Sequence, residues 1–197
     1  MKKIYITNGS GTNGKDTFAR LMNKYVSTYK YSSINLVKYM LEVAGIKEDE
    51  KTEEYRLLCS EMKDRLTKYD DIPFKDITSI VTDFKNNNLS TDILLIDIRE
   101  PEEIARAVKT FGAETILIRN PDVKKIESNH ADRDVENYNY DYVIENNGTL
   151  EQLDYITHQF VNQIILQKEK RSSSSFVIYD PLTSKRTTVF VANKILR

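Results

Sequence analysis

The sequence has only one cysteine and two histidines among its 197 residues, and it has no tryptophan. A single cysteine cannot form an internal disulfide, so we do not expect a secreted, disulfide-bonded fold, and one thiol with two imidazoles cannot complete a Cys/His zinc site. The chain also lacks an excess of charge of one sign, because it has 29 Lys+Arg residues and 30 Asp+Glu residues. This balance gives no overall field for binding nucleic acid or an anionic membrane.

Long hydrophobic runs are missing as well. The first apolar run ends at Ile6, and no later window has enough unbroken apolar residues to cross a bilayer. We therefore expect no signal segment, no membrane anchor and a cytoplasmic location. The length fits one compact domain of slightly more than average size.

Glycine is scarce, with six residues in the chain, yet Gly9, Gly11 and Gly14 crowd into six positions. Residues 9–15 (GSGTNGK) fit G-x-x-x-x-G-K, a loop whose backbone N–H groups surround nucleotide phosphates while its lysine reaches the β and γ phosphates. A β-rich run precedes this segment and a helical pattern follows it, as the motif requires. The spacing disfavours a dinucleotide loop, and a simple glycine-rich turn is the structural alternative.

Strand patterns alternate with helical patterns along the chain. The predicted strands are 3–7, 29–33, 92–98, 115–118 and 142–145, and amphipathic helices lie between them. This order predicts an α/β protein with the three-layer P-loop NTPase fold, in which helices flank a five-stranded parallel sheet. Cys59 lies on the apolar stripe of a helix that begins after Thr52, so we expect it in the core.

The chain divides by composition into a P-loop kinase-like domain, residues 1–170, and a C-terminal segment, residues 171–197. Within the first, the polar stretch 121–140 is predicted to be a lid. The second combines a serine-rich linker with two β-rich runs, 176–179 and 187–191, which predict an appended β-hairpin. Exposed strands can pair with a second subunit, so a homodimer through this hairpin is a candidate assembly.

Three blocks of sequence carry a family resemblance. The string Gly14-Lys15-Asp16-Thr17 resembles the deoxynucleoside monophosphate kinase branch of the nucleoside monophosphate kinases, and also some phosphomevalonate kinases. Residues 94–103 (LLIDIREPEE) look like that branch's strand followed by Asp-x-Arg and an acidic helix start. Residues 117–150 look like its strand, lid, strand and turn. The resemblance covers roughly residues 1–168.

The resemblance implies ATP and Mg²⁺ as cofactors, and it assigns roles to particular residues. ATP would lie on Gly9, Ser10, Gly11, Thr12, Asn13, Gly14, Lys15, Asp16 and Thr17, with its adenine near Asn147 and Gly148. Mg²⁺ would lie near Thr17 and Asp97. Lys15, Asp97, Arg99, Arg119 and Arg133 would act on the phosphoryl group, and the acceptor would enter over the helices between Ile34 and Phe84.

Each charged candidate also has a structural alternative. An acidic residue near Asp97 can cap the following helix. Arg99 can form a surface ion pair with Glu102 or Glu103, although its spacing from Asp97 predicts that both side chains point to the same face. Arg119 and Arg133 can be solvated loop arginines.

The predicted function is ATP-dependent transfer of the γ-phosphoryl group to a small phosphorylated acceptor, with a (deoxy)nucleoside monophosphate as the leading acceptor. The expected partners are small nucleotides, without nucleic acid or membrane. One alternative is a kinase of a non-nucleotide phosphorylated acceptor, such as phosphomevalonate. Another is a nucleotide-binding regulatory or assembly protein with little turnover.

Overall fold

The chain folds into two compact units in the computed structural model, which describes residues 2–46, 52–123, 135–166, 176–179 and 186–191. Unit 1 comprises Met1–Lys30 with Asp92–Arg197, and unit 2 comprises Tyr31–Thr91. Each unit is described by itself below. No helix in the described ranges is long and apolar enough to cross a bilayer.

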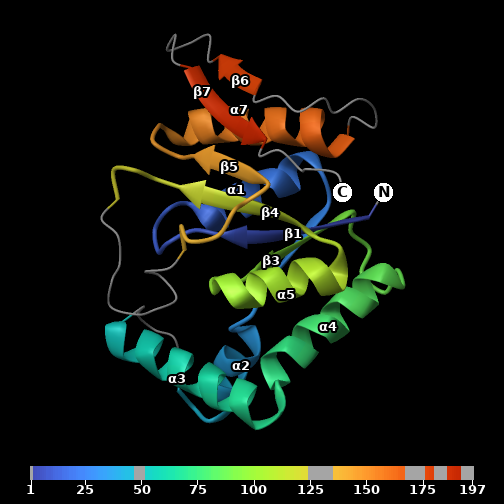
Figure 1. Cartoon of the computed structure of the whole chain (residues 1–197), viewed down its shortest axis with the longest axis vertical. Coiled ribbons are helices and arrows are strands. Elements are labelled where there is room, and N and C mark those ends of the chain that lie inside the picture. The colour runs from blue at the N-terminus through green and yellow to red at the C-terminus, as the bar shows by residue number, and fades with distance from the viewer. Residues whose placement is uncertain (1, 47–51, 124–134, 167–175, 180–185, 192–197) are drawn as a thin grey trace. The chain divides into compact units, whose positions relative to one another are not determined.

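Helices and strands alternate through most of the chain (Figure 1). The helices are α1 (Lys15–Tyr25), α2 (Asn35–Val43), α3 (Glu53–Asp70), α4 (Ile72–Lys85), α5 (Pro101–Phe111), α7 (Leu150–Phe160) and the π-helix η1 (Val161–Leu166). The strands are β1 (Lys3–Asn8), β2 (Thr28–Ser32), β3 (Ile93–Asp97), β4 (Glu114–Arg119), β5 (Tyr142–Glu145), β6 (Phe176–Tyr179) and β7 (Arg186–Val191).

The five predicted strands form one sheet in the order β2-β3-β1-β4-β5. Strand β1 lies at its centre and pairs in parallel with β3 and with β4, and β4 pairs in parallel with β5. The register places Thr7 beside Asp97. The prediction of a five-stranded parallel α/β sheet is therefore confirmed, and the carboxyl ends of β1 and β3 meet at one edge.

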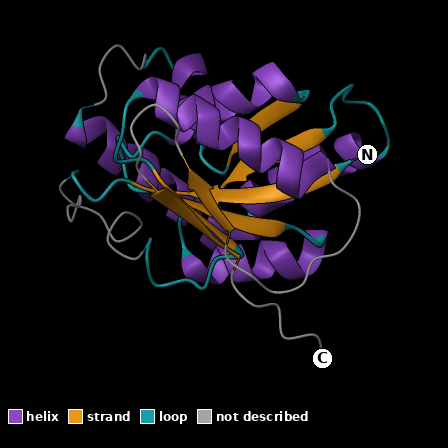
Figure 2. Cartoon of the chain, turned by 90° about the horizontal axis from the view of Figure 1, so that it is seen from above, coloured by secondary structure: helices purple, strands orange, loops and turns teal. Residues whose placement is uncertain are grey.

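Helices cover both faces of this sheet (Figure 2). Alternate residues of the strands, such as Tyr5 and Leu95, join a buried cluster with α1 and α7, whose members include Phe18 and Phe160. The residues between them point to the opposite face, where the apolar side of α5 is buried. Strands buried on both faces read as continuous apolar runs, which is why residues 93–96 (ILLI) show no alternation.

The C-terminal strands extend the sheet to seven strands. Strand β6 pairs antiparallel with β7, as predicted for a hairpin, and β7 also pairs antiparallel with β5. The hairpin is therefore continuous with the parallel sheet in the structure. The predicted serine-rich linker and most of the predicted lid lie outside the described residues.

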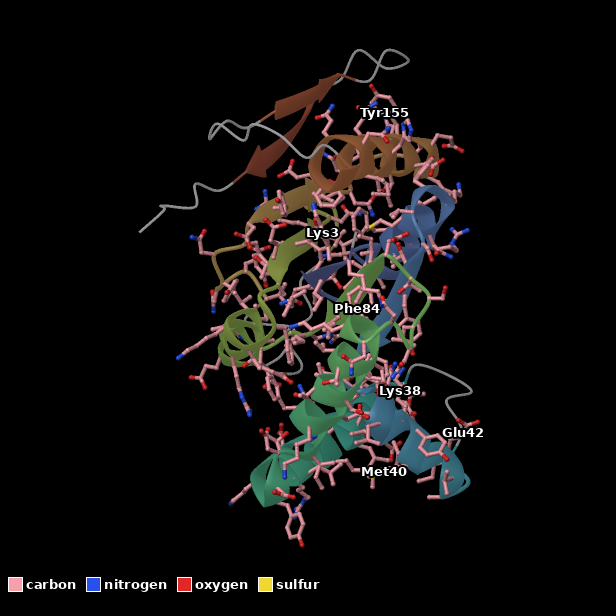
Figure 3. The ribbon with its side chains drawn as sticks, turned by 90° about the vertical axis from the view of Figure 1, so that its right-hand side faces the viewer. Lys3, Lys38, Met40, Glu42, Phe84 and Tyr155 are labelled. Carbon is pink, nitrogen blue, oxygen red and sulfur yellow. The ribbon has the colours of Figure 1, made fainter. Side chains whose placement is uncertain are left out.

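The described residues of unit 2 form the helices α2, α3 and α4. Val37, Leu41 and Cys59 form the centre of a small apolar cluster, which confirms Cys59 as a core residue. Met40, near the end of α2, is partly exposed (Figure 3). Within the unit, the Tyr31 hydroxyl donates a hydrogen bond 2.5 Å long to Asp76 of α4.

Several helix ends follow from capping chemistry. Thr52 accepts a hydrogen bond 3.2 Å long from the backbone N–H of Tyr55 at the start of α3, and Thr149 forms a capping box with Gln152 at the start of α7. The last helix changes type along its length, because the α-helix ends at Phe160 and a π-helix, Val161–Leu166, follows.

Candidate phosphate-binding site

The glycine loop, residues 9–15, connects β1 to α1 at the carboxyl edge of the sheet. The Asn8 side chain accepts a hydrogen bond 2.8 Å long from the N–H of Gly9, and the carbonyl of Gly14 accepts the first-turn bond of α1 from Phe18. Lys15 is the first residue of α1. The amino end of a helix presents N–H groups and a positive dipole end, so the loop carries the backbone features of an anion site.

Two of the loop glycines have no room for a side chain. A Cβ atom on Gly9 would lie 2.5 Å from the carbonyl oxygen of Ile118 on β4. Gly14 has φ +92°, a left-handed conformation, and a Cβ atom there would collide with the amide of Asn146. The loop therefore runs close against the ends of β4 and β5, and its shape depends on the motif's glycines.

Asparagine side chains fix the loop in this position. Asn146, just after β5, donates a hydrogen bond 3.0 Å long to the carbonyl of Asn13, and its own N–H bonds to the Arg119 carbonyl over 2.7 Å. The buried amide of Asn13 in turn donates to the Ile118 carbonyl, 3.5 Å away. These contacts tie the loop to both neighbouring strands.

Lys15 and Asp97, two of the residues to which the family resemblance assigns a role at the phosphoryl group, lie together. The Lys15 ammonium is 3.5 Å from Oδ2 of Asp97, and both side chains are largely buried. Thr7, the partner of Asp97 in the β1–β3 register, donates its hydroxyl hydrogen to Oδ1. An acidic side chain at the end of β3 thus holds the loop lysine beside the amino end of α1.

Lys30 joins the same carboxylate, and sequence reasoning missed it. Its ammonium lies 2.8 Å from Oδ2 of Asp97 and also forms an ion pair with Asp16. Burial lowers the pKa of Lys30, but attraction to the two carboxylates outweighs it, so the pKa lies above its ordinary value. The only available signal was that a lysine occurs in a predicted strand, which is too common to indicate a site.

Thr17 and Asp97 suit a Mg²⁺ ion that enters the site bound to the phosphates of a nucleotide. The described residues contain no cluster of three His, Cys, Asp or Glu side chains arranged around a cation. Mg²⁺ does not require one, because it keeps water and phosphate oxygens and takes one or two protein oxygens. The Thr17 hydroxyl and the Asp97 carboxylate can supply these oxygens. A direct bond to Oδ2 would require an ammonium to move aside.

The other predicted residues are not all gathered around this lysine pair. The Arg99 carbonyl accepts a hydrogen bond from Asn8, and Arg99 lies just beyond β3, so strand alternation does not set the direction of its side chain. Arg119 forms an ion pair with Glu145 on the neighbouring strand. Asn147 and Gly148 form the exposed turn before α7, and Arg133 lies outside the described residues.

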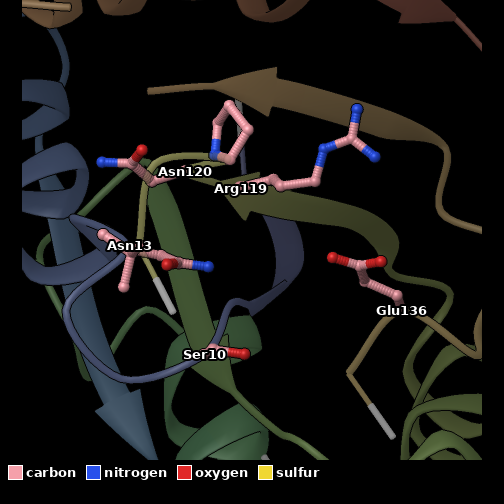
Figure 4. Close-up of a pocket in the computed structure, with 7 residues that line it drawn as sticks. Ser10, Asn13, Arg119, Asn120 and Glu136 are labelled. Atoms are coloured by element: carbon pink, nitrogen blue, oxygen red, sulfur yellow. The ribbon is translucent and has the colours of Figure 1, made fainter. Parts of the chain in front are cut away.

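A pocket of about 290 Å³ opens beside the glycine loop. It is lined by Ser10, Asn13, Arg119, Asn120, Pro121, Val123 and Glu136. In Figure 4 the loop residues Ser10 and Asn13 lie opposite Arg119 and Glu136. Nε of Arg119 is buried and has no hydrogen-bond partner among the described residues. The pocket therefore pairs a phosphate-type loop with a guanidinium that retains an unused donor.

A buried polar link also joins the loop to the segment that ends the predicted lid. The Asn8 amide donates to the Tyr140 hydroxyl over 2.7 Å, and that hydroxyl donates to the Val135 carbonyl, also over 2.7 Å. Burial raises the pKa of Tyr140, so its hydroxyl remains a donor. The spacing of Tyr138, Tyr140 and Tyr142 predicts only half-burial in a strand, and the polar role of Tyr140 left no sequence signal.

Comparison with known proteins gives structural neighbours only, because no family model and no curated protein sequence matches the chain. The crystal structure of TT1252 from Thermus thermophilus has a TM-score of 0.42 and 14% identity, covering 83% of this chain and 98% of that one. Shikimate kinase from Aquifex aeolicus has a TM-score of 0.42 and 13% identity, with 82% and 98% covered. Shikimate kinase from Acinetobacter baumannii, in complex with shikimate, has a TM-score of 0.42 and 13% identity, with 86% and 96% covered.

Proposed function

We propose that the protein is an ATP-dependent phosphotransferase that moves the γ-phosphoryl group of ATP to a small phosphorylated acceptor. The observation that carries this proposal is the position of Lys15. It begins helix α1 after a loop in which a Cβ atom at Gly9 or Gly14 would collide with neighbouring atoms, and it lies 3.5 Å from a buried carboxylate at the end of the adjacent strand. This arrangement suits a polyphosphate chain.

The protein's contribution to this reaction is positioning and charge stabilisation. Phosphoryl transfer proceeds through a transition state whose charge is spread over three oxygens, so cations and N–H donors at those oxygens lower the barrier. The loop N–H groups and Lys15 would bind the phosphates, and Asp97 holds the lysine in place beforehand. Thr17 and Asp97 would hold Mg²⁺, which neutralises phosphate charge when bound.

A (deoxy)nucleoside monophosphate is the acceptor that the sequence favours. The support is the Gly-Lys-Asp-Thr string together with the Asp-x-Arg block after β3, which resemble the deoxynucleoside monophosphate kinases. In this assignment Arg99, Arg119 and Arg133 neutralise the phosphates of donor and acceptor. The pocket beside the loop, where the buried Nε of Arg119 has no hydrogen-bond partner among the described residues, is consistent with a phosphorylated ligand.

The test is ADP release from ATP in the presence of Mg²⁺ and a panel of ribo- and deoxyribonucleoside monophosphates, with phosphomevalonate as a non-nucleotide acceptor. We expect turnover with one or a few nucleotides. Lys15→Ala should lower kcat roughly 100-fold or more, as expected for loss of a cation at the transferring group. The matched control is Lys24→Ala, which removes an exposed lysine from the same helix.

Three other results would each contradict part of this proposal. Turnover with phosphomevalonate alone would move the acceptor to a non-nucleotide class. Tight ATP binding without turnover on any acceptor would indicate a nucleotide-binding regulatory protein. Unchanged ATP affinity in Lys15→Ala would remove the glycine loop as the nucleotide site.

A further inference from the structure

Two lysine ammoniums share one carboxylate oxygen at the end of β3. Lys30 approaches Oδ2 of Asp97 to 2.8 Å, and Lys15 approaches the same atom to 3.5 Å. The two lysines come from different elements, β2 and α1, so the sheet and the loop bring them together independently. The ammoniums are therefore close neighbours beside the amino end of α1.

The positive charge around Asp97 is larger than its single carboxylate requires. Its carboxylate is compensated by Lys15 and by the hydroxyl of Thr7, and Lys30 adds a further positive charge. That charge is balanced by Asp16, whose side chain is 72% exposed, while the Lys30 side chain is 29% exposed. Lys30 thus has one firm partner that is buried and one weak partner at the surface.

We propose that Lys30 is a second phosphate-binding lysine. It would bind the polyphosphate of the nucleotide beside Lys15, so this inference rests on the function proposed above. Asp97 and Asp16 hold its ammonium at the site before the nucleotide arrives. On binding, the ammonium keeps its contact with Asp97 and exchanges Asp16 for a phosphate oxygen.

The exposure of Asp16 makes this exchange inexpensive. Ion pairs that face water contribute little to stability, because both groups are well solvated when they separate. A charge-assisted hydrogen bond to a phosphate in a water-poor site is considerably stronger. The lysine is also already placed, so less side-chain freedom is lost on binding.

The exchange also accounts for an unusual feature of the loop sequence. Position 16 follows the loop lysine, where the motif normally has serine or threonine, and here it carries aspartate. An acidic residue next to a phosphate site would repel the ligand if it stood alone. Because Asp16 is paired with Lys30, its carboxylate serves as a counterion for the Lys30 ammonium until a phosphate oxygen replaces it.

The first experiment measures ATP affinity by calorimetry in the presence of Mg²⁺ for the wild-type protein, Lys30→Met and Lys24→Met. Lys24 is a matched control, since its ammonium lies 3.3 Å from Asp154 in an exposed lysine–aspartate pair of the same unit. Loss of a charged hydrogen bond should weaken ATP binding roughly tenfold or more in Lys30→Met. Lys24→Met should bind ATP as the wild type does.

The second experiment needs no substitution and remains decisive if Lys30→Met fails to fold. Lysine acetylation of the full-length wild-type protein is quantified by mass spectrometry, with and without ATP. A bound polyphosphate should protect Lys30 and Lys15 from acetylation, and it should leave Lys24 equally reactive in both samples.

The outcomes separate this inference from the function on which it rests. If the wild-type protein binds no ATP, the proposed function fails. If it binds ATP while Lys30→Met loses less than tenfold in affinity, or while Lys30 is not protected, the phosphate role of Lys30 is overturned and the proposed function stands. A tenfold loss together with protection supports the role.

Discussion

Three asparagine side chains, Asn8, Asn13 and Asn146, hold the glycine loop to the sheet. Each carries both a donor and an acceptor without a net charge. Asn8 accepts the N–H of Gly9 over 2.8 Å, Asn13 donates to the Ile118 carbonyl of β4 over 3.5 Å, and Asn146 donates to the Asn13 carbonyl over 3.0 Å. Charged side chains in these places would compete with phosphate for Lys15, so neutral amides fix the loop without weakening its positive field.

Gly14→Ala should destabilise the protein more than Gly112→Ala does. Both positions have positive φ, +92° and +70°, so both substitutions incur the strain of a left-handed residue, about 1 kcal/mol. Only at Gly14 does the new methyl group also collide with Asn146, whereas space around Gly112 is open. Urea unfolding measures the difference, and equal losses for the two variants would contradict the close packing of loop against β5.

The ends of the helices are set by residues close to them in the sequence. Pro101 and the acidic residues after it begin α5, and Gly112, with φ +70°, ends it. The Thr149 side chain accepts the N–H of Gln152, whose own side chain accepts the N–H of Thr149. These capping and helix-ending residues lie within a few positions of the helix end, so they can be recognised from the sequence.

Thr149→Ala should lower the free energy of unfolding by about 1 kcal/mol, because α7 loses one half of its capping box. Chemical denaturation provides the measurement. The control is Thr110→Ala on α5, where an exposed hydroxyl donates to the Arg106 carbonyl one turn earlier. A loss no larger than that of the control would show that the capping box does not stabilise α7.

The sequence predicts the elements of this fold better than it predicts the contacts of the site. Apolar periodicity and glycine placement locate the five parallel strands and the loop, because those patterns are local. The pairing of Lys30 with Asp97 joins residues 67 positions apart through the sheet order, which no local pattern encodes. The same holds for Tyr140, whose hydroxyl reaches Asn8 across 132 positions.

At the scale of the whole molecule, the sheet changes character from one side to the other. Five parallel strands are followed by two antiparallel ones, and β6 is the last strand in the order. An outer strand carries backbone donors and acceptors on the side away from its partner. We therefore keep the homodimer through the C-terminal hairpin as a proposal, with β6 as its contact strand.

Light scattering over a range of concentrations should give twice the chain mass of 22.9 kDa for the wild-type protein. Ile178→Pro removes a backbone donor from β6 and should shift the mass toward that of one chain. Deleting residues 171–197 is less specific, because it also uncovers β5. A single-chain mass for the wild type at every concentration would contradict the dimer.

The tyrosine pair beside the glycine loop has a spectroscopic consequence. Without tryptophan to receive their excitation, the twelve tyrosines supply the ultraviolet fluorescence of the chain. Tyr138 and Tyr140 stack edge to face with ring centroids 5.2 Å apart, and Tyr140 is bonded to Asn8, the residue that precedes the loop. A nucleotide that shifts Asn8 would alter the emission of these rings, so the unlabelled protein carries its own optical signal for events at the loop.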